Sequence, residues 1–112
     1  MKYFIILPIL LIVYLFYLLS NHEISSDKAK KMIREGKIDY IIDVRTLEEW
    51  NEGHHPDAVH LPMGTYPKNI NKNSRILIYC RTGRRAKIAV QQYIKKGYKN
   101  VTYITGNYKS LL

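Results

Sequence analysis

The chain has 112 residues, a single cysteine and a formal net charge of +9. This length accommodates one small domain and excludes a second, and one cysteine excludes both an internal disulfide and a cysteine-rich zinc site. The positive charge favours an anionic partner, either a small oxyanion, a lipid headgroup or nucleic acid. The lysines are scattered and form no known nucleic-acid motif, so we expect no nucleic-acid partner.

The first segment, residues 3–19, is the uncharged apolar run YFIILPILLIVYLFYLL. It approaches the length of a bilayer's hydrocarbon core and is apolar on every face. A cleaved secretory signal would end at a small-x-small site, which LLSNHE matches poorly. We therefore expect residues 1–21 to form an uncleaved single-pass transmembrane helix and a short linker. Cations after the span predict a domain, residues 22–112, that faces the cytoplasm.

The next segment reads as a helix followed by a buried strand. The stretch SSDKAKKMIREGK, residues 25–37, has Ser25 or Ser26 as a candidate N-cap and Gly36 as a terminator. DYIIDV, residues 39–44, is largely apolar, which is typical of a strand buried in a parallel sheet. The pattern therefore predicts a helix packed beside a parallel sheet.

A short helix follows the first strand. Thr46 and Glu49 have the T-x-x-E spacing of a capping box, which predicts a helix over LEEWNE, residues 47–52, ended by Gly53. A turn and a short extended piece around Val59 come next, and then a polar loop. This segment predicts a short helix and a minor strand.

Two further strands flank an amphipathic helix in the last third of the chain. RILIYC, residues 75–80, and NVTYIT, residues 100–105, read as strands, and AKIAVQQYIKKG, residues 86–97, reads as a helix. Its expected inner side comprises Ile88, Ala89, Tyr93 and Ile94. Strands that alternate with helices predict an α/β fold, a small parallel β-sheet flanked by helices and preceded by the transmembrane helix.

The loop after the second long strand holds the cysteine. Cys80 ends the strand, and a helix begins just after it, so its loop lies where ligands bind in open α/β sheets. Backbone N–H groups and the helix N-terminus supply partial positive charge there, and Gly83 permits an unusual backbone conformation. This setting, with arginines close by, favours a reactive thiolate and attracts an anion.

Four motifs in order make the chain resemble a rhodanese homology domain. They are D-V-R at 43–45, an acid–aromatic pair at 49–50, G-H-x-P-x-A at 53–58 and C-R-x-G-x-R at 80–85. The resemblance covers roughly residues 22–112. It departs from the family where the short polar loop replaces a usual helix, which predicts that one sheet face is thinly covered.

The resemblance implies a sulfurtransferase. Cys80 would be catalytic, taking a sulfane sulfur from a donor such as thiosulfate as a persulfide and passing it to a thiophilic acceptor. The partners would be a small anionic sulfur donor, a thiol acceptor and, through residues 3–19, the membrane. Neither a metal nor an organic cofactor is needed. The implied substrate-binding residues are Arg81, Thr82, Gly83, Arg84 and Arg85.

Two alternatives remain open. A non-enzymatic binding or sulfur-relay module could use the same pocket. A phosphatase or arsenate reductase of similar fold is disfavoured, because related phosphatases use C-x5-R, whereas here Arg85 is the fifth residue after Cys80 and position 86 is alanine.

Several other polar or aromatic residues have structural interpretations. Three histidines at 54, 55 and 60 lack a further cysteine or nearby carboxylate that would complete a metal site, so we expect His54 to hold its turn by hydrogen bonding. Asp43 and Arg45 are expected to pair at the strand end, and Trp50 to lie in the core.

Overall fold

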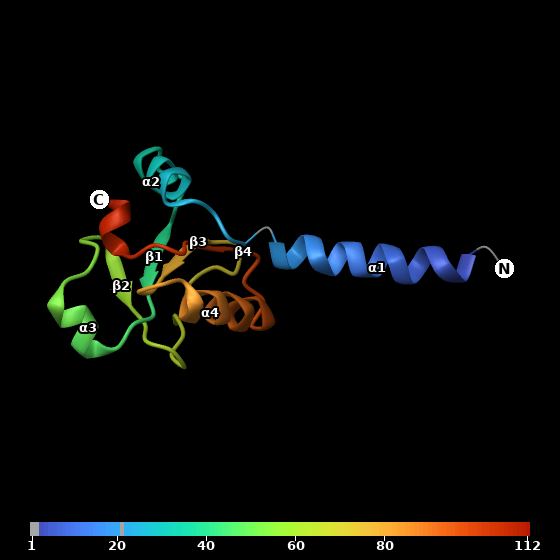
Figure 1. The fold of residues 1–112 in the computed structure, drawn as a ribbon. Coiled ribbons are helices and arrows are strands. Elements are labelled where there is room, and N and C mark those ends of the chain that lie inside the picture. Colours follow the sequence, from blue (N-terminus) through green and yellow to red (C-terminus); the bar gives the residue numbers. More distant parts are fainter. Residues whose placement is uncertain (1–2, 21) are drawn as a thin grey trace.

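The computed structural model describes residues 3–20 and 22–112. Its sheet has four parallel strands in the order β2-β1-β3-β4, which confirms the predicted parallel α/β fold (Figure 1). The strands are β1 (Tyr40–Asp43), β2 (Ala58–His60), β3 (Arg75–Tyr79) and β4 (Asn100–Tyr103). The helices are α1 (Tyr3–Ser20), α2 (Ser26–Arg34), α3 (Leu47–Glu52), α4 (Arg84–Lys95) and the 3₁₀ helix η1 (Tyr108–Leu111).

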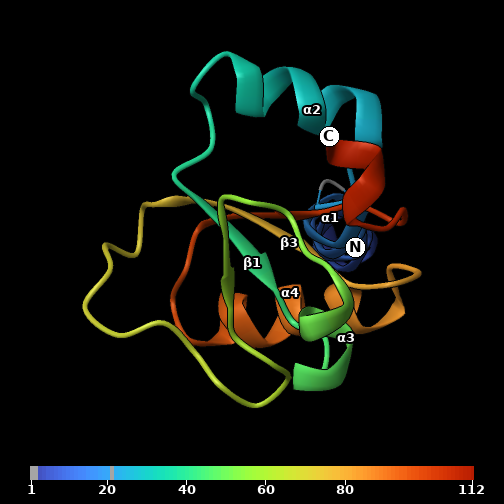
Figure 2. The ribbon, with the colours of Figure 1, turned by 90° about the vertical axis from the view of Figure 1, so that its left-hand side faces the viewer.

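The sheet has a core on each face, because successive side chains along a strand point to opposite sides. In β1, Ile42 packs into the cluster that includes Val90 and Tyr93 of α4. Its neighbour Ile41 packs into the cluster that includes Ala29 of α2. Figure 2 shows α4 on one side of the strands, with α2 and η1 on the other. Both faces are therefore covered, as a parallel sheet requires.

The predicted local signals act as expected in the first two helices of the domain. The Ser25 hydroxyl accepts the Lys28 backbone N–H at 3.1 Å and caps α2, and Gly36 follows the helix with φ +69°. In α3 both bonds of the Thr46–Glu49 capping box are present. These predictions are confirmed, and the capping box fixes where α3 begins beside the end of β1.

The inner side of α4 differs from the prediction in two positions. Ala89 and Tyr93 are buried as expected, but Ile88 and Ile94 are 43% and 39% exposed. The buried face instead continues through two other residues, Ala86 and Val90. Since the helix is rotated relative to our expectation, two isoleucines lie on its outer surface.

The loop of residues 61–74 covers part of the α4 face of the sheet without forming a helix. Four of its side chains pack partly buried against that core, and the Tyr66 hydroxyl donates to Gln92 Oε1 at 3.2 Å. The packed side chains are Leu61, Met63, Tyr66 and Ile70. The sheet face that was predicted to be thinly covered is therefore covered by apolar side chains of this loop instead of by a helix.

The N-terminal helix α1 extends away from the sheet (Figure 1). Within residues 3–20 and 22–112, no helix combines the length and apolar character needed to cross a bilayer. The predicted transmembrane helix over residues 3–19 and the membrane as a partner are therefore not supported, and the predicted single-pass membrane localisation, with its domain facing the cytoplasm, is wrong. Residue 21, which ends the predicted linker, lies outside the described residues.

Candidate active site

The site lies where β1 and β3 end next to each other. The two strands are parallel neighbours, and Asp43 is in register with Tyr79. The segments that follow them, beginning with Val44 and Cys80, therefore start side by side at the carboxyl edge of the sheet. This is the edge at which open α/β sheets bind ligands.

The Cys80 sulfur is enclosed by the backbone of its own loop. Cys80 is 1% exposed. Its Sγ accepts the backbone N–H of Gly83 at 3.0 Å and that of Ala86 at 3.4 Å. Two N–H groups aimed at one sulfur favour negative charge on it, as does the N-terminus of α4, which begins within this loop. The arrangement suits a thiolate nucleophile.

Gly83 shapes this loop. It is the N-cap of α4 and has φ +90°, a conformation that L side chains rarely adopt. A Cβ at this position would lie 2.7 Å from Thr105 Cα and 3.2 Å from the Ile104 carbonyl oxygen. The loop thus packs closely against the segment after β4, and only glycine lets the backbone N–H point at Sγ.

The other predicted binding residues divide into an exposed group and a paired one. Arg81, Thr82 and Arg84 are exposed on the loop surface. Arg85 is half-buried and donates from Nη1 and Nη2 to Glu49 Oε1 and Oε2 at 2.6 and 2.9 Å. The structure therefore leaves three of these side chains open to solvent and holds the fourth against α3.

The Arg85–Glu49 contact ties the cysteine loop to α3. Hydrogen bonds from Arg85 hold the pKa of the Glu49 carboxyl at about 2, well below its ordinary value, and the Glu49 carboxylate raises the pKa of Arg85. A guanidinium that already pairs with a carboxylate binds a second anion more weakly. Arg85 is thus placed to fix the loop, and the exposed Arg81 and Arg84 are freer to meet an anion.

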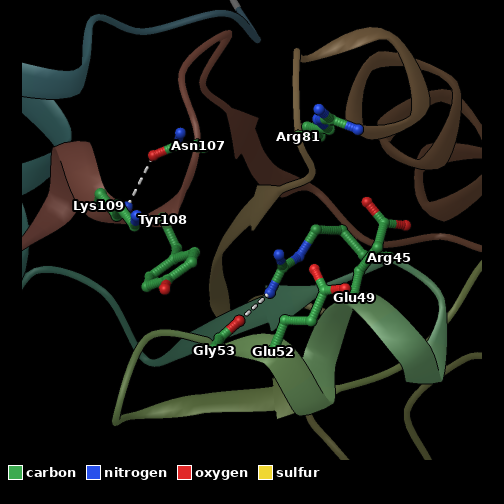
Figure 3. A pocket seen from close by; sticks show the side chains of 8 residues that line it. All are labelled: Arg45, Glu49, Glu52, Gly53, Arg81, Asn107, Tyr108 and Lys109. Atoms are coloured by element: carbon green, nitrogen blue, oxygen red, sulfur yellow. Dashed lines mark hydrogen bonds between the residues drawn. The ribbon is translucent and has the colours of Figure 1, made fainter.

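A pocket of about 310 Å³ opens beside the loop (Figure 3). Its walls come from the end of β1, from α3, from the cysteine loop and from the C-terminal segment. Arg81, next in sequence to Cys80, contributes the loop's part of the wall, and the described lining does not include Cys80 itself. The lining residues are Arg45, Glu49, Glu52, Gly53, Arg81, Asn107, Tyr108 and Lys109. The pocket thus combines cations and carboxylates.

The end of β1 carries the expected structural pair. Asp43 is fully buried, and its carboxylate accepts Arg45 Nη2 at 2.7 Å and Nε at 3.0 Å. Arg45 Nη2 also donates to the Gly53 carbonyl at 2.6 Å, and its guanidinium lies over the Tyr108 ring at 5.2 Å. The prediction of a structural pair is confirmed. Its covering residue Tyr108 had no signal in the sequence, because η1 was not expected.

The aromatic and histidine residues near α3 form a stack on the surface. Trp50 is half-buried and stacks with His54 and with His60, at ring-centroid distances of 3.4 and 4.8 Å, so its predicted core position is wrong. His54 Nδ1 donates to the Trp50 carbonyl at 2.9 Å, which confirms its role in the turn. Within the described parts of the chain, no three potential ligands gather around a metal position.

The remaining histidine, His55, is enclosed instead. His55 is 4% exposed, and its Nδ1 accepts the Asp57 backbone N–H at 3.1 Å. Its own backbone N–H donates to the Tyr79 hydroxyl at 3.1 Å. Burial lowers the pKa of His55, so the ring favours the neutral form. The turn is therefore anchored to the sheet by the last residue before Cys80.

The chain matches the Rhodanese-like domain family over residues 25–112. It belongs to the rhodanese-like family. This match covers every strand and the whole cysteine loop, so the resemblance expected from the four motifs is confirmed.

Relatives of this rhodanese-like chain are named for sulfur chemistry. A sulfurtransferase of Allochromatium vinosum is 32% identical over 88 residues, covering 76% of this chain and 82% of the relative. YrkF of Bacillus subtilis, whose name proposes a sulfur carrier, is 37% identical over 82 residues, which are 70% of this chain but only 44% of YrkF. The chain thus spans less than half of YrkF.

Solved structures show the same fold. The human single-domain sulfurtransferase TSTD1 superposes with a TM-score of 0.69 at 19% identity, covering 81% of this chain and 95% of the human one. The protein SSP1007 of Staphylococcus saprophyticus gives 0.64 at 29% identity, covering 81% and 93%. The fold of the rhodanese-like domain is therefore shared along most of the length of each pair of chains.

Proposed function

We propose that residues 22–112 form a thiosulfate sulfurtransferase-like domain that carries sulfane sulfur as a persulfide on Cys80. The observation that carries this proposal is the sulfur's setting, with two backbone N–H groups at 3.0 and 3.4 Å from Sγ at the start of α4. The same donors would stabilise negative charge on a persulfide. Family membership and relatives named sulfurtransferase support it.

The proposed reaction has two displacement steps. The Cys80 thiolate attacks the outer sulfur of thiosulfate, the S–S bond of the donor breaks, and its electron pair leaves on sulfite. An acceptor thiolate or cyanide then attacks the outer sulfur of the persulfide. The new bond forms as the persulfide S–S bond breaks, and that electron pair returns to Sγ. Atoms and electrons balance without a metal or organic cofactor.

The loop residues have separate proposed roles. Exposed Arg81 and Arg84, with the Thr82 hydroxyl, would meet the anionic donor as it approaches and stabilise the departing sulfite. The Gly83 N–H would hold the sulfur, and Arg85, paired with Glu49, would keep the loop in place. Arg81 also lines the pocket beside the loop, which offers room for the sulfite group.

The test is thiocyanate formation from thiosulfate and cyanide by the full chain, with Cys80→Ser as the matched control. Mass spectrometry of the thiosulfate-treated chain should find one added sulfur on Cys80. Both signals should be absent from the serine variant, and neither chain should cleave an aryl phosphate. A folded, reduced wild-type chain that gives neither signal would remove the proposed function for this donor.

A further inference from the structure

The charges of this chain are distributed very unevenly along its length. All nine Asp and Glu residues lie before residue 58, and residues 58–112 contain eleven Lys and Arg. Two of these cations have carboxylate partners, Arg75 with Asp39 and Arg85 with Glu49. Two more lie over aromatic rings, Lys72 over Tyr98 and Lys96 over Tyr66. The strongest unbalanced positive charge therefore lies in the half that holds Cys80.

Several of the remaining cations share the outer face of α4 with apolar side chains. The exposed positions of this helix recur every three to four residues, so they form one stripe. Between its cations lie Ile88 and Ile94, at 43% and 39% exposure. The stripe, called here the outer α4 stripe, comprises Arg84, Lys87, Ile88, Gln91, Ile94 and Lys95. Since α4 has no acidic residue, every charged side chain in the stripe is positive, and these cations flank an apolar centre.

The outer α4 stripe runs into a groove at its far end. The groove has a volume of about 840 Å³ and is bounded by the last turns of α4 and by Tyr14 and Leu15 of α1. Ile94 and Tyr98 contribute apolar surface to it, and Lys95 lies where it meets the stripe. Figure 1 shows the end of α4 next to the end of α1. The groove could therefore receive an apolar side chain from a bound partner.

The near end of the same stripe adjoins the reactive sulfur. Arg84 is the first residue of α4, and the backbone N–H of Ala86 in the same turn points at Cys80 Sγ. At about 1.5 Å per residue, Lys87 and Lys95 are roughly 12 Å apart along the helix. This separation exceeds the size of a small oxyanion such as thiosulfate. A ligand that contacts both lysines and also reaches Cys80 must be macromolecular.

We propose that the outer α4 stripe is the docking surface for an acidic protein that exchanges sulfur with Cys80. The partner would place carboxylates against Lys87 and Lys95, an apolar side chain against the two isoleucines, and its own thiol at the cysteine loop. The inference rests on the proposed function. In the transfer step the partner's thiolate attacks the outer sulfur of the Cys80 persulfide, and the electron pair of the broken S–S bond returns to Sγ.

The apolar centre of the stripe favours a protein over nucleic acid. Nucleic-acid sites that follow a phosphate backbone combine cations with aromatic side chains on which bases stack. The outer α4 stripe has aliphatic isoleucines at its centre and no aromatic residue. Apolar side chains surrounded by charged ones are typical of a protein interface with its apolar core and polar rim. An acidic protein therefore fits both the shape and the charge of this surface.

The test uses two synthetic peptides as sulfur acceptors, each with one cysteine and one leucine. One peptide carries four glutamates, and the other carries four lysines in their place. The full chain is supplied with thiosulfate as the sulfur donor for Cys80, and the rate of sulfur transfer to each peptide is followed by mass spectrometry. The docking variant is Lys87→Glu with Lys95→Glu. The control is Lys28→Glu with Lys68→Glu, which changes the net charge equally at exposed positions outside the stripe.

We expect the transfer kinetics to change in the docking variant much more than in the control variant. With the glutamate peptide, its KM should rise about tenfold at low salt, and the increase should shrink at high salt. Its thiocyanate formation with cyanide should stay unchanged, since cyanide needs no docking surface. The control should change the KM by less than about threefold. Equal effects in the two variants, or no preference of the wild type for the glutamate peptide, would overturn the proposal.

A binding measurement separates this proposal from the proposed function. The glutamate peptide with its thiol alkylated should bind the wild-type chain in fluorescence anisotropy and bind the docking variant more weakly. This holds even if Cys80 takes no sulfur from thiosulfate, in which case only the proposed function fails. A single-stranded RNA that binds the wild type more tightly than the peptide, with the same loss in the docking variant, would assign the stripe to nucleic acid instead.

Discussion

The ends of β1 and β3 are neighbours in one sheet and carry charged residues in a similar position, but they differ in how those charges are satisfied. At the end of β1, the Asp43 carboxylate and the Arg45 guanidinium pair with each other and are almost fully buried. At the end of β3, Arg81 and Arg84 are exposed, and the backbone donors point at a sulfur. The comparison teaches that exposed cations distinguish the proposed active site at the end of β3 from the buried structural pair at the end of β1.

The largest expected effect comes from breaking the buried pair. Asp43→Asn leaves the Arg45 charge buried without its carboxylate and should lower the free energy of unfolding by about 3 kcal/mol. Urea denaturation measures this loss. Sulfur transfer per folded molecule should change little, because Asp43 is not part of the cysteine loop.

The control for this variant is Asp43→Asn combined with Arg45→Met. It removes the buried charge and keeps a side-chain oxygen for the backbone N–H of residue 45, which the Asp43 carboxylate accepts at 2.8 Å. Stability should be partly regained. A loss of transfer per folded molecule in Asp43→Asn would show that the end of β1 takes part in the chemistry and would break the comparison.

The second effect is at the end of β3, where the proposed catalytic residue Cys80 lies. Gly83→Ala places a Cβ 2.7 Å from Thr105 Cα at a φ of +90°, so the loop must shift. We expect a stability loss of about 2 kcal/mol and a transfer rate lower by about 100-fold, because the N–H bond to Sγ is lost. Steady-state kinetics and urea denaturation on the same sample measure both.

Gly36→Ala is the matched control. Gly36 also has positive φ, +69°, but a Cβ added there would meet no atom within 4 Å. It should lose about 1 kcal/mol of stability and no activity. Equal losses of activity in the two variants would mean that general destabilisation, not the position of the Gly83 N–H, limits transfer.

A third effect concerns the histidine between the two ends. Because burial lowers the pKa of His55, the unfolded chain binds a proton at a higher pH than the folded chain does. Stability should therefore be fully present above pH 6.5, the ordinary value, and fall as the pH drops below it, by at most about 1.4 kcal/mol per pH unit. Thermal unfolding between pH 5 and 8 measures the slope.

His55→Asn is the control, because its side-chain oxygen can still accept the Asp57 N–H. The variant should flatten the slope over this range. An unchanged slope would assign the proton uptake to another group. The experiment bears on the comparison of the two strand ends. The hydrogen bond from the His55 backbone N–H to the Tyr79 hydroxyl joins the turn after α3 to the end of β3.

The smallest effect is expected from Glu49→Gln, which weakens the ion pair that joins α3 to the cysteine loop. The pair is partly exposed, with side-chain exposures of 33% for Arg85 and 22% for Glu49, so we expect a loss of about 0.5 kcal/mol. Because the folded-state pKa of Glu49 is lowered to about 2 from 4.5, the pair's contribution should be present above pH 4.5. It should fade as the pH falls toward 2.

Glu48→Gln, on the same helix and exposed, is the control. It should change neither stability nor transfer, whereas Glu49→Gln should also raise the KM for thiosulfate modestly. Urea denaturation at pH 7 and at pH 2.5 measures the stability difference. A difference that persists undiminished at the lower pH would show that Glu49 acts through packing instead of charge.

Local signals in the sequence predicted the local structure. Ser25 and the Thr46–Glu49 box specify helix starts through contacts within one turn, and the structure has both. The position of Cys80 at a strand end followed from the apolar run before it. The membrane prediction rested on the length and apolar character of residues 3–19, and no described helix meets the requirements of a span.

The rest of the site depends on contacts between distant residues, which periodicity does not contain. Arg85 and Glu49 are separated by 36 positions. Their pairing leaves Arg85 less available to a ligand than the loop motif alone suggests. Ile88 was expected to face the core, but Ala86 and Val90 continue the buried face of α4 and leave this residue outside. Tyr108 covers Arg45 only because η1 follows β4.

The all-parallel pairing of the sheet has a kinetic consequence. Parallel neighbours cannot form from a local hairpin, and β1 must wait for β3, whose first residue lies 35 positions after Tyr40 in the chain. Each pairing therefore requires closure of a long loop before any contact is gained, which slows folding. We expect refolding on the millisecond-to-second scale.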